Sequence, residues 1–220
     1  MSNKIILIGA GSQGRVTRDV LIDQKQDFAG FIDDGKKNVV IKGTNVRVFG
    51  GIDTVPSLAA ENYQFIVTIG NNLTRRKIAE NMDLGESYFA NAVHPSSVVL
   101  NTADIGCGNM IFAQTFIGTC AEIGDHVIVN NGVTVEHDCK IGDFAALGPG
   151  CRMGGRVTVD EGAFVSTGVT LKPRVHVGRN AVIGAGAVVV NDIPDNAMAY
   201  GCPAKVVRDN ITEDIWGKLL

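Results

Sequence analysis

A hydrophobic repeat with a period of six residues dominates the sequence from residue 99 to residue 190. An aliphatic residue or Met fills every sixth position without a gap: Ile105, Ile111, Ile117, Ile123, Val129, Val135, Ile141, Leu147, Met153, Val159, Val165, Leu171, Val177, Ile183 and Val189. This period fits neither the 3.6 residues of an α-helix nor the two residues of a free strand. It predicts a parallel β-helix built from hexapeptide repeats.

A triangular coil made of three short strands explains the period physically. Every sixth side chain then points into a prism and stacks on its equivalents, and each coil buries its apolar edge only against its neighbours. Eight of the fifteen aliphatic positions are followed by Gly, which needs little room where the backbone turns a corner. The fifteen repeats predict five coils, with no insertion that would send a long loop out of the prism.

The N-terminal part has a different pattern, which indicates a small α/β unit. Residues 4–8 are expected to form a buried strand that runs into Gly9-Ala10-Gly11-Ser12-Gln13-Gly14, and residues 15–23 have helical apolar spacing. A second expected strand ends at Phe31-Ile32-Asp33-Asp34, so acidic residues follow about twenty residues after the glycines. This is the context of a glycine-rich loop whose backbone N–H groups favour phosphate, and it predicts a nucleotide or pyrophosphate ligand.

The remaining N-terminal strands are too few for a complete dinucleotide-binding sheet. Residues 47–49 form a weak candidate, whereas residues 64–69 form a strong one that is closed by Gly70-Asn71-Asn72 and followed by a helix to about residue 82. Half a doubly wound sheet favours a mononucleotide over NAD. A glycine turn with a purely structural role remains a further alternative.

The chain is expected to divide near His94-Pro95, after a last N-terminal strand at residues 88–93. Residues 1–94 then form the α/β domain, and residues 95–220 form the β-helix with a C-terminal cap. Residues 201–207 are expected to be irregular, and a short helix is expected from Thr212 to the C-terminus with Thr212 as its N-cap. The fold class is therefore mainly β, with a small Rossmann-like domain before a β-helix.

Charge and cysteine content exclude several classes of function. The net charge of −3, with no run of Lys and Arg, argues against a nucleic-acid surface. Five cysteines without a CxxC pair favour a reducing cytoplasm. We expect no signal peptide at the N-terminus and no membrane span, because no apolar run approaches the ~20 residues that a span needs.

An ordered set of motifs resembles the hexapeptide-repeat acyltransferases, and among them the bacterial branch that acetylates amino sugars and sialic acid. These motifs are the glycine loop, Asp33-Asp34, Gly70-Asn71-Asn72, the segment Val135-Glu136-His137-Asp138-Cys139-Lys140-Ile141-Gly142-Asp143-Phe144, and Gly201-Cys202-Pro203-Ala204-Lys205. The chain is most similar to enzymes that acetylate the 4-amino group of nucleotide-linked 4-amino-4,6-dideoxy sugars, including the UDP-sugar enzyme of bacillosamine synthesis. The resemblance therefore implies a UDP-linked acceptor. The resemblance implies a left-handed prism, a homotrimer, acetyl-CoA in the groove between neighbouring prisms, no metal, and a role in surface glycan synthesis.

His137 is the candidate catalytic residue. It follows the inward-pointing Val135 by two positions and therefore lies near a corner, where coils of eighteen residues place Thr119 and Gly155 beside it. The resemblance assigns His137 as general base and Asp138 as the group that raises its basicity, which suits an amine that must lose a proton as it attacks a thioester. Asp138 can reach the imidazole only if the chain bends there, because successive side chains of a flat strand point to opposite faces.

The resemblance also implies binding residues for both substrates. The Gly155 amide would donate to the thioester carbonyl, and backbone near Thr167 and Ala185 would hold CoA. The nucleotide-sugar would be held by Gly11, Ser12, Gln13, Asp33, Asp34 and Gly70. The chain departs from many relatives where Gln13 and Ala146 replace histidines, and Ala146 would leave donor binding to backbone groups.

Three alternatives stay open at this point. The first is O-acetylation of a sialic acid, since the enzymes that do this share the glycine loop. The second is a zinc enzyme of the carbonic anhydrase type, but its candidate ligands His126, His137 and His176 occupy different positions within their repeats. The third is a sugar-nucleotide sensor without catalysis, which the neighbouring His137 and Asp138 disfavour.

Overall fold

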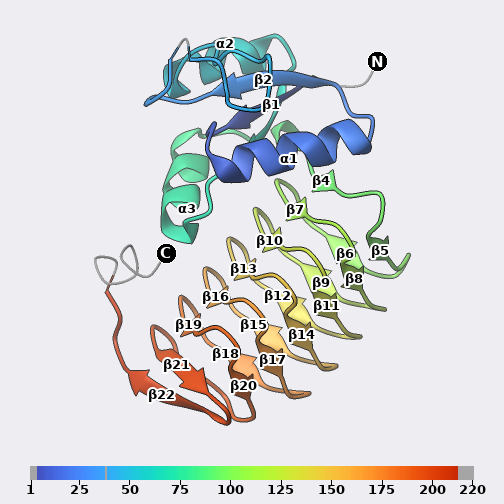
Figure 1. The fold of residues 1–220 in the computed structure, drawn as a ribbon, viewed down its shortest axis with the longest axis vertical. Helices are drawn as coiled ribbons and strands as arrows, with labels where there is room; N and C mark the ends of the chain where they lie inside the picture. The colour runs from blue at the N-terminus through green and yellow to red at the C-terminus, as the bar shows by residue number, and fades with distance from the viewer. Residues whose placement is uncertain (1–3, 38, 213–220) are drawn as a thin grey trace.

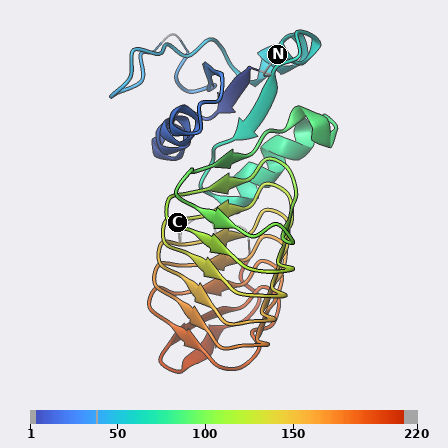
Figure 2. The same cartoon turned by 90° about the vertical axis from the view of Figure 1, so that its right-hand side faces the viewer.

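The computed structural model describes residues 4–37 and 39–212. A small α/β domain lies against one face of a parallel β-helix, as the sequence predicts, and the β-helix is left-handed, as the resemblance implies (Figure 1, Figure 2). Within the described residues, no helix is both long and apolar enough to cross a membrane.

The N-terminal domain contains a three-stranded parallel sheet in the order β2-β1-β3. Its strands are β1 (Ile5–Ile8), β2 (Phe28–Ile32) and β3 (Gln64–Val67). Its helices are α1 (Ser12–Asp23), α2 (Val55–Ala60) and α3 (Asn72–Asn81), with the 3-10 turns η1 (Ile52–Thr54) and η2 (Glu86–Tyr88). Three strands are the partial sheet that the sequence indicates.

Two strand predictions in this part of the chain are wrong. Residues 47–49 form only isolated bridges, from Val48 to Phe31 and from Arg47 to Val40. Residues 88–93 do not form one strand, because η2 takes up Tyr88, Phe89 makes only an isolated bridge to Phe65, and Ala92–Val93 forms the short strand β4. This strand pairs with β7 of the β-helix, so the first coil begins before the expected boundary at His94.

Three sheets form the faces of the prism, and their strands pair in parallel except for β22. The docking sheet, which faces the N-terminal domain, contains β4 (Ala92–Val93), β7 (Met110–Ile111), β10 (Ile128–Val129), β13 (Ala146–Leu147), β16 (Phe164–Val165), β19 (Val182–Ile183), β21 (Met198–Gly201) and β22 (Ala204–Arg208). The second sheet contains β5 (Val98–Val99), β8 (Phe116–Ile117), β11 (Thr134–Val135), β14 (Arg152–Met153), β17 (Thr170–Leu171) and β20 (Val188–Val189). The third sheet contains β6 (Asp104–Ile105), β9 (Glu122–Ile123), β12 (Lys140–Ile141), β15 (Thr158–Val159) and β18 (His176–Val177).

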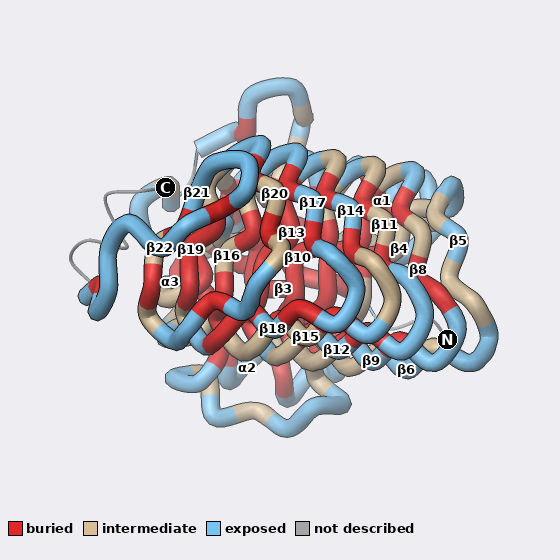
Figure 3. The backbone as a smooth tube through the Cα atoms, turned by 90° about the horizontal axis from the view of Figure 1, so that it is seen from below, coloured by how far each residue is buried: buried red, intermediate tan, exposed pale blue. Residues whose placement is uncertain are grey.

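The predicted aliphatic columns form the core of the prism. Inward residues such as Val135, Leu147 and Val159 are fully buried, and Figure 3 shows buried positions along the strands with exposed positions between them. The β-helix has about six turns, against the five predicted. The difference arises because Val93 and Val99 continue the period upstream and pack partly buried against the same core.

Residues in the left-handed backbone conformation turn the corners of the prism. The second corner, between the second and third sheets, uses Cys120, Asp138, Arg156 and Arg174, with φ between 54° and 66°. Such a conformation costs a non-Gly residue roughly 1–2 kcal/mol, which the stacked coils must offset. The first corner, between the docking and second sheets, uses mainly Gly, and the third corner, between the third and docking sheets, includes His126 and Phe144.

The outer face of the docking sheet is apolar and holds the two domains together. Ala92, Met110, Ile128 and Ala146 are buried in one cluster with residues of β1 and α1. At the C-terminal end, β21 and β22 form an antiparallel hairpin, so the expectation of irregular structure at residues 201–207 is wrong. The expected terminal helix lies outside the described residues, apart from Thr212.

Candidate functional site

His137 and Asp138 form a hydrogen-bonded pair at the second corner. His137 Nδ1 lies 2.8 Å from Asp138 Oδ2. Asp138 has a φ of 56°, and this left-handed residue supplies the bend that the sequence required. Both side chains are about half exposed. The pair therefore faces solvent and is accessible to a ligand.

The coils on either side hold the main chain of this pair. The Asp138 amide donates to Thr119 O at 3.0 Å, and the Arg156 amide donates to His137 O at 2.9 Å. A Cβ atom added to Gly155 would lie only 2.4 Å from His137 Nε2. Gly155 is therefore the residue that leaves room for the imidazole, as its place in the repeat predicts.

The electrostatics of the pair fix its protonation pattern. The hydrogen bond from His137 lowers the pKa of the Asp138 carboxyl, and the nearby Arg156 lowers it further. Arg156 Nε lies 3.5 Å from Asp138 Oδ2. A carboxylate at Nδ1 favours the tautomer with the proton on that atom, so Nε2 presents its lone pair to the solvent side.

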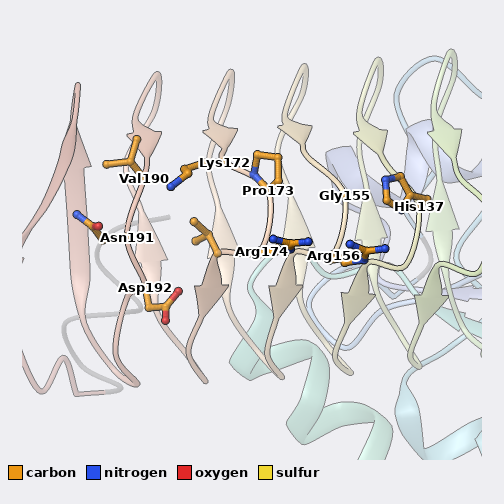
Figure 4. A pocket seen from close by; sticks show the side chains of 10 residues that line it. His137, Gly155, Arg156, Lys172, Pro173, Arg174, Val190, Asn191 and Asp192 are labelled. Atoms are coloured by element: carbon orange, nitrogen blue, oxygen red, sulfur yellow. The ribbon is translucent and has the colours of Figure 1, made fainter.

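A groove with a volume of about 560 Å³ runs along the second corner from His137. His137 lies at one end, Asn191 and Asp192 at the other, and Arg156 and Arg174 between them (Figure 4). Lys172 adds a third cation to its lining. Three cations in one groove suit a ligand with several phosphate groups. The sequence prediction omitted these cations, although the eighteen-residue spacing of Arg156 and Arg174 was a signal for stacked positions.

Within one chain, Thr167 and Ala185 lie at a different corner of the prism from His137. Both follow docking-sheet strands, β16 and β19, and precede second-sheet strands, so they occupy the first corner. Their eighteen-residue separation stacks them one coil apart. The second sheet thus separates these two predicted donor-binding residues from the His137–Asp138 pair.

Ala146, a predicted donor-site residue, packs between the two domains, and its place in the donor site stays a prediction. It lies in β13 of the docking sheet and is 3% exposed, in the cluster that packs the prism against the N-terminal domain. The outward positions of β4, β7, β10 and β13 are covered by that domain. Ala at this position therefore serves close packing between the two domains.

The glycine loop has the geometry that its motif predicts. Gly9 has a φ of 102°, and a Cβ on Gly14 would lie 2.1 Å from Gly9 O, so both positions need glycine. Helix α1 begins at Ser12 with Gly11 as its N-cap, and no side chain caps it. The first backbone N–H groups of α1, including those of Ser12 and Gln13, thus have no side-chain cap to satisfy them, which suits an anionic ligand.

The acidic pair mainly organises this loop. Asp33 accepts hydrogen bonds from the amides of Ala10 at 2.8 Å and Gly35 at 2.9 Å, one on each carboxylate oxygen. Asp34 accepts from the amide of Ile52 at 3.0 Å. Gln13 turns toward the prism, where its amide nitrogen lies 3.7 Å from the sulfur of Met110. Direct substrate contacts by these three side chains stay a prediction.

Two cavities are lined by residues of the glycine loop. The first, of about 300 Å³, is lined by Gly11 and Ser12 together with Arg15, Lys36 and Lys42. The second, of about 410 Å³, is lined by Gly9, Asp33, Asp34 and apolar residues that include Ile69. Gly70, which follows Ile69, begins the turn into α3. The predicted nucleotide-sugar residues are therefore brought together around the carboxyl ends of β1, β2 and β3.

The three histidines of the zinc alternative lie apart. His126 is buried at the third corner between Phe89 and Phe144, whereas His137 is at the second corner. His176 is in β18 and pairs with Asp160 at 2.6 Å. Among residues 4–37 and 39–212, no group of three His, Cys, Asp or Glu side chains could hold a metal ion.

Gly155→Ala is expected to lower the activity of this site on the order of 100-fold. A methyl group at this position displaces the imidazole of His137, and a misplaced reacting group has an effect of that size. The backbone at Gly155 is not left-handed, so Ala adds no conformational strain. Steady-state kinetics and thermal unfolding test this. Gly85→Ala is the matched control, since nothing lies within 4 Å of a Cβ there. Full activity in Gly155→Ala would contradict the geometry.

Comparisons with known proteins match both parts of the chain. Residues 4–82 match the family model described as PglD N-terminal domain, and residues 121–155 match the model described as bacterial transferase hexapeptide. A GDP-perosamine N-acetyltransferase of Escherichia coli O157:H7 is 32% identical over 203 residues, which are 89% of this chain and 81% of that protein. A UDP-N-acetylbacillosamine N-acetyltransferase of Bacillus subtilis is 35% identical over 113 residues, about half of each chain.

A solved structure extends the similarity to the whole described fold. PerB from Caulobacter crescentus, in complex with CoA and GDP-perosamine, has a TM-score of 0.85 and 32% sequence identity. The match covers 93% of this chain and 97% of PerB. The α/β domain and the prism are therefore matched together within one protein.

Proposed function

The chain belongs to the hexapeptide-repeat acetyltransferases with a PglD-type N-terminal domain, and we propose that it transfers an acetyl group from acetyl-CoA to the 4-amino group of a nucleotide-linked 4-amino-4,6-dideoxy sugar. The observation that carries this proposal is the His137–Asp138 pair, whose free Nε2 opens onto a groove with three cations. The relatives named above, with their GDP- and UDP-linked amino sugars, support the substrate class.

The proposed reaction is direct attack of the amine on the thioester. The amine nitrogen forms a bond to the acetyl carbonyl carbon while His137 Nε2 removes its proton, and Asp138 stabilises the imidazolium that results. The Gly155 amide would donate to the oxyanion of the tetrahedral intermediate. The C–S bond then breaks, and CoA leaves as the thiol after its sulfur takes up that proton from the His137 imidazolium.

The basic groove suits the donor. CoA carries a pyrophosphate and a further phosphate at the far end from its thioester. Arg156, Lys172 and Arg174 line the groove between His137 and its other end, so they are placed to bind these phosphates while the thioester reaches the imidazole. Bidentate arginine contacts to phosphate are among the stronger charge-assisted hydrogen bonds.

We propose a homotrimer in which each active centre lies between two chains. The N-terminal domain covers the docking sheet, and His137 lies at the second corner, on the opposite side of the triangular prism. A nucleotide-sugar bound at the glycine loop is thus far from His137 of its own chain. A neighbouring prism would bring its own corner to that loop, and Thr167 and Ala185 at the first corner would supply the other wall of the donor groove.

The proposed nucleotide is GDP. The similarity to the GDP-perosamine enzyme extends over 89% of the chain, whereas the similarity to the UDP-sugar enzyme extends over 50%. The UDP-linked sugar expected from the sequence remains the alternative, and an assay must compare its turnover with that of the GDP-linked sugar.

The experiment that tests this function is a panel of acceptors with acetyl-CoA, followed by release of free thiol and by mass spectrometry of the product. We expect turnover with GDP-4-amino-4,6-dideoxy sugars, weaker turnover with UDP- and dTDP-linked analogues, and none with sialic acid. Acetylation of sialic acid alone would make the chain an O-acetyltransferase. Absence of turnover with every acceptor would contradict acetyl transfer to a nucleotide-sugar.

A further inference from the structure

Helix α3 carries two polar side chains that are completely buried. Arg75 is 0% exposed and Asn72 is 1% exposed, although the helix has a polar sequence. Arg is almost never fully buried unless its charge and its hydrogen bonds are satisfied. Both residues face the prism, so their polar groups must find partners at the boundary between the two domains.

The guanidinium of Arg75 contacts both domains at once. On the prism side, Nε donates to His126 O at 2.9 Å and Nη2 donates to Phe144 O at 2.7 Å. On the N-terminal side, Nη1 donates to Ile69 O at 2.8 Å and to Gly70 O at 3.3 Å.

These bonds, with one from Nη2 to Asn72 Oδ1 at 3.0 Å, use the full set of five N–H donors of the guanidinium. Each of these acceptors is a neutral carbonyl or amide oxygen. Burial, and to a lesser degree Arg76, lowers the pKa of Arg75 to about 9, so it still carries its charge at neutral pH. A charged donor strengthens every hydrogen bond that it makes to these carbonyl groups.

The loop held by Arg75 forms a wall of the predicted acceptor site. Ile69 lines the cavity of about 410 Å³ together with Gly9, Asp33 and Asp34. Ile69 also lies close to the glycine loop, since a Cβ on Gly9 would be 2.5 Å from its Cδ1 atom. A shift of residues 69 and 70 would therefore change the width of this cavity and the position of the Gly70 backbone.

Other contacts attach α3 to the prism without touching that loop. Asn72 Nδ2 donates to Gly162 O at 3.2 Å and to Ala163 O at 3.1 Å. Arg76 pairs with Glu161 at 2.7 Å. Attachment of the helix therefore does not depend on Arg75 alone. The contact that Arg75 adds is the direct connection between the prism and the carbonyl groups of Ile69 and Gly70.

From these contacts we propose that Arg75 is a positioning residue, which holds the Ile69–Gly70 wall of the acceptor site in register with the prism. It acts through the backbone of that wall and not through contact with the reacting atoms. The proposal rests on the proposed function, because it assigns the cavity beside Gly70 to the nucleotide-sugar. Its consequence is a selective effect on the acceptor, with the donor groove at the second corner unchanged.

Arg75→Lys tests this, since Lys keeps the charge but cannot make five directed hydrogen bonds. We expect the KM for the nucleotide-sugar to rise about tenfold or more, which corresponds to the loss of one or two bonds to a charged group. The KM for acetyl-CoA should stay within about twofold, as the donor groove is separate. Arg76→Lys is the matched control, and it should leave both KM values unchanged, because Lys can keep the ion pair with Glu161.

Two further measurements separate positioning from simple stability. Titration calorimetry with GDP and with UDP needs no turnover, and we expect a rise of about tenfold in the Kd of the nucleotide that the wild type binds better. Free guanidinium ion should restore acceptor affinity to Arg75→Ala if that variant folds, whereas urea, which is neutral, should not.

The outcomes are distinct. A lower Tm in Arg75→Lys with unchanged nucleotide Kd and unchanged acceptor KM would overturn the positioning role. Equal rises in the KM of donor and acceptor would overturn it as well. A wild type that acetylates no nucleotide-sugar contradicts the proposed function itself. In that case the nucleotide Kd of Arg75→Lys still tests the positioning role of Arg75, because that measurement needs no turnover.

Discussion

Replacing His137 with Ala is expected to lower kcat for acetyl transfer by about 10²- to 10⁴-fold, the usual contribution of a positioned general base. The imidazole is half exposed and its side chain makes one hydrogen bond, to Asp138, so its removal leaves the aliphatic core intact. Unfolding temperature, oligomeric state and the Kd of both ligands should therefore match the wild type. Steady-state kinetics, thermal unfolding and titration calorimetry provide these measurements.

His176→Ala is the matched control for this prediction. His176 is also a half-exposed histidine of the prism, and it also pairs with an aspartate, Asp160. It lies outside the lining of the groove that begins at His137. We expect the control to keep full activity. Activity of His137→Ala within threefold of the control would remove His137 from the mechanism, because a general base cannot be lost at so small a cost.

The prism could be predicted from sequence because its pattern of inward-pointing aliphatic side chains repeats. Each coil places the same kind of side chain in the same column, so an error at one position does not change the pattern. The missing coil shows the limit of this reasoning. Val93 and Val99 keep the period, but Pro95 between them indicates a boundary in a linear reading of the chain. Only the pairing of β4 with β7 shows that the prism begins before Pro95.

The geometry of the His137–Asp138 pair was predictable in part. The repeat placed His137 at a corner beside Gly155, and the need for a bend at Asp138 could be stated in advance. The left-handed φ of Asp138 answers that need, since it turns the carboxylate toward the imidazole. The sequence could not show which outward column the N-terminal domain covers. The burial of Ala146 between the domains is therefore visible only in the structure.

Arg75 shows a different limit. A helix with Asn, Thr, Arg and Lys residues predicts a solvated surface, and an arginine in it gives no sign of burial. Its partners are backbone carbonyl groups of coils that are more than fifty residues away, at His126 and Phe144. Backbone acceptors leave no residue-type signature. Contacts of this kind are therefore accessible only from the structure.

Co-assembly of two inactive variants should restore activity if each active centre draws on two chains. His137→Ala lacks the base. Gly11→Phe should block the glycine loop without disturbing the fold, because nothing lies within 4 Å of a Cβ at Gly11 and its backbone φ is −81°. In a cyclic trimer that contains both variants, one of the three centres combines an intact base with an intact loop. We therefore expect about one third of wild-type activity per trimer.

Two different affinity tags and sequential purification isolate the mixed trimers, and each variant purified alone is the control. The result discriminates sharply between the two arrangements. If the loop and the base of one chain served the same centre, each centre in a mixed trimer would lack one of the two, and the mixture would stay as inactive as its parents. Activity near one third instead requires that the nucleotide-sugar on one chain meets His137 of its neighbour, as expected from the opposite placement of the docking sheet and the second corner.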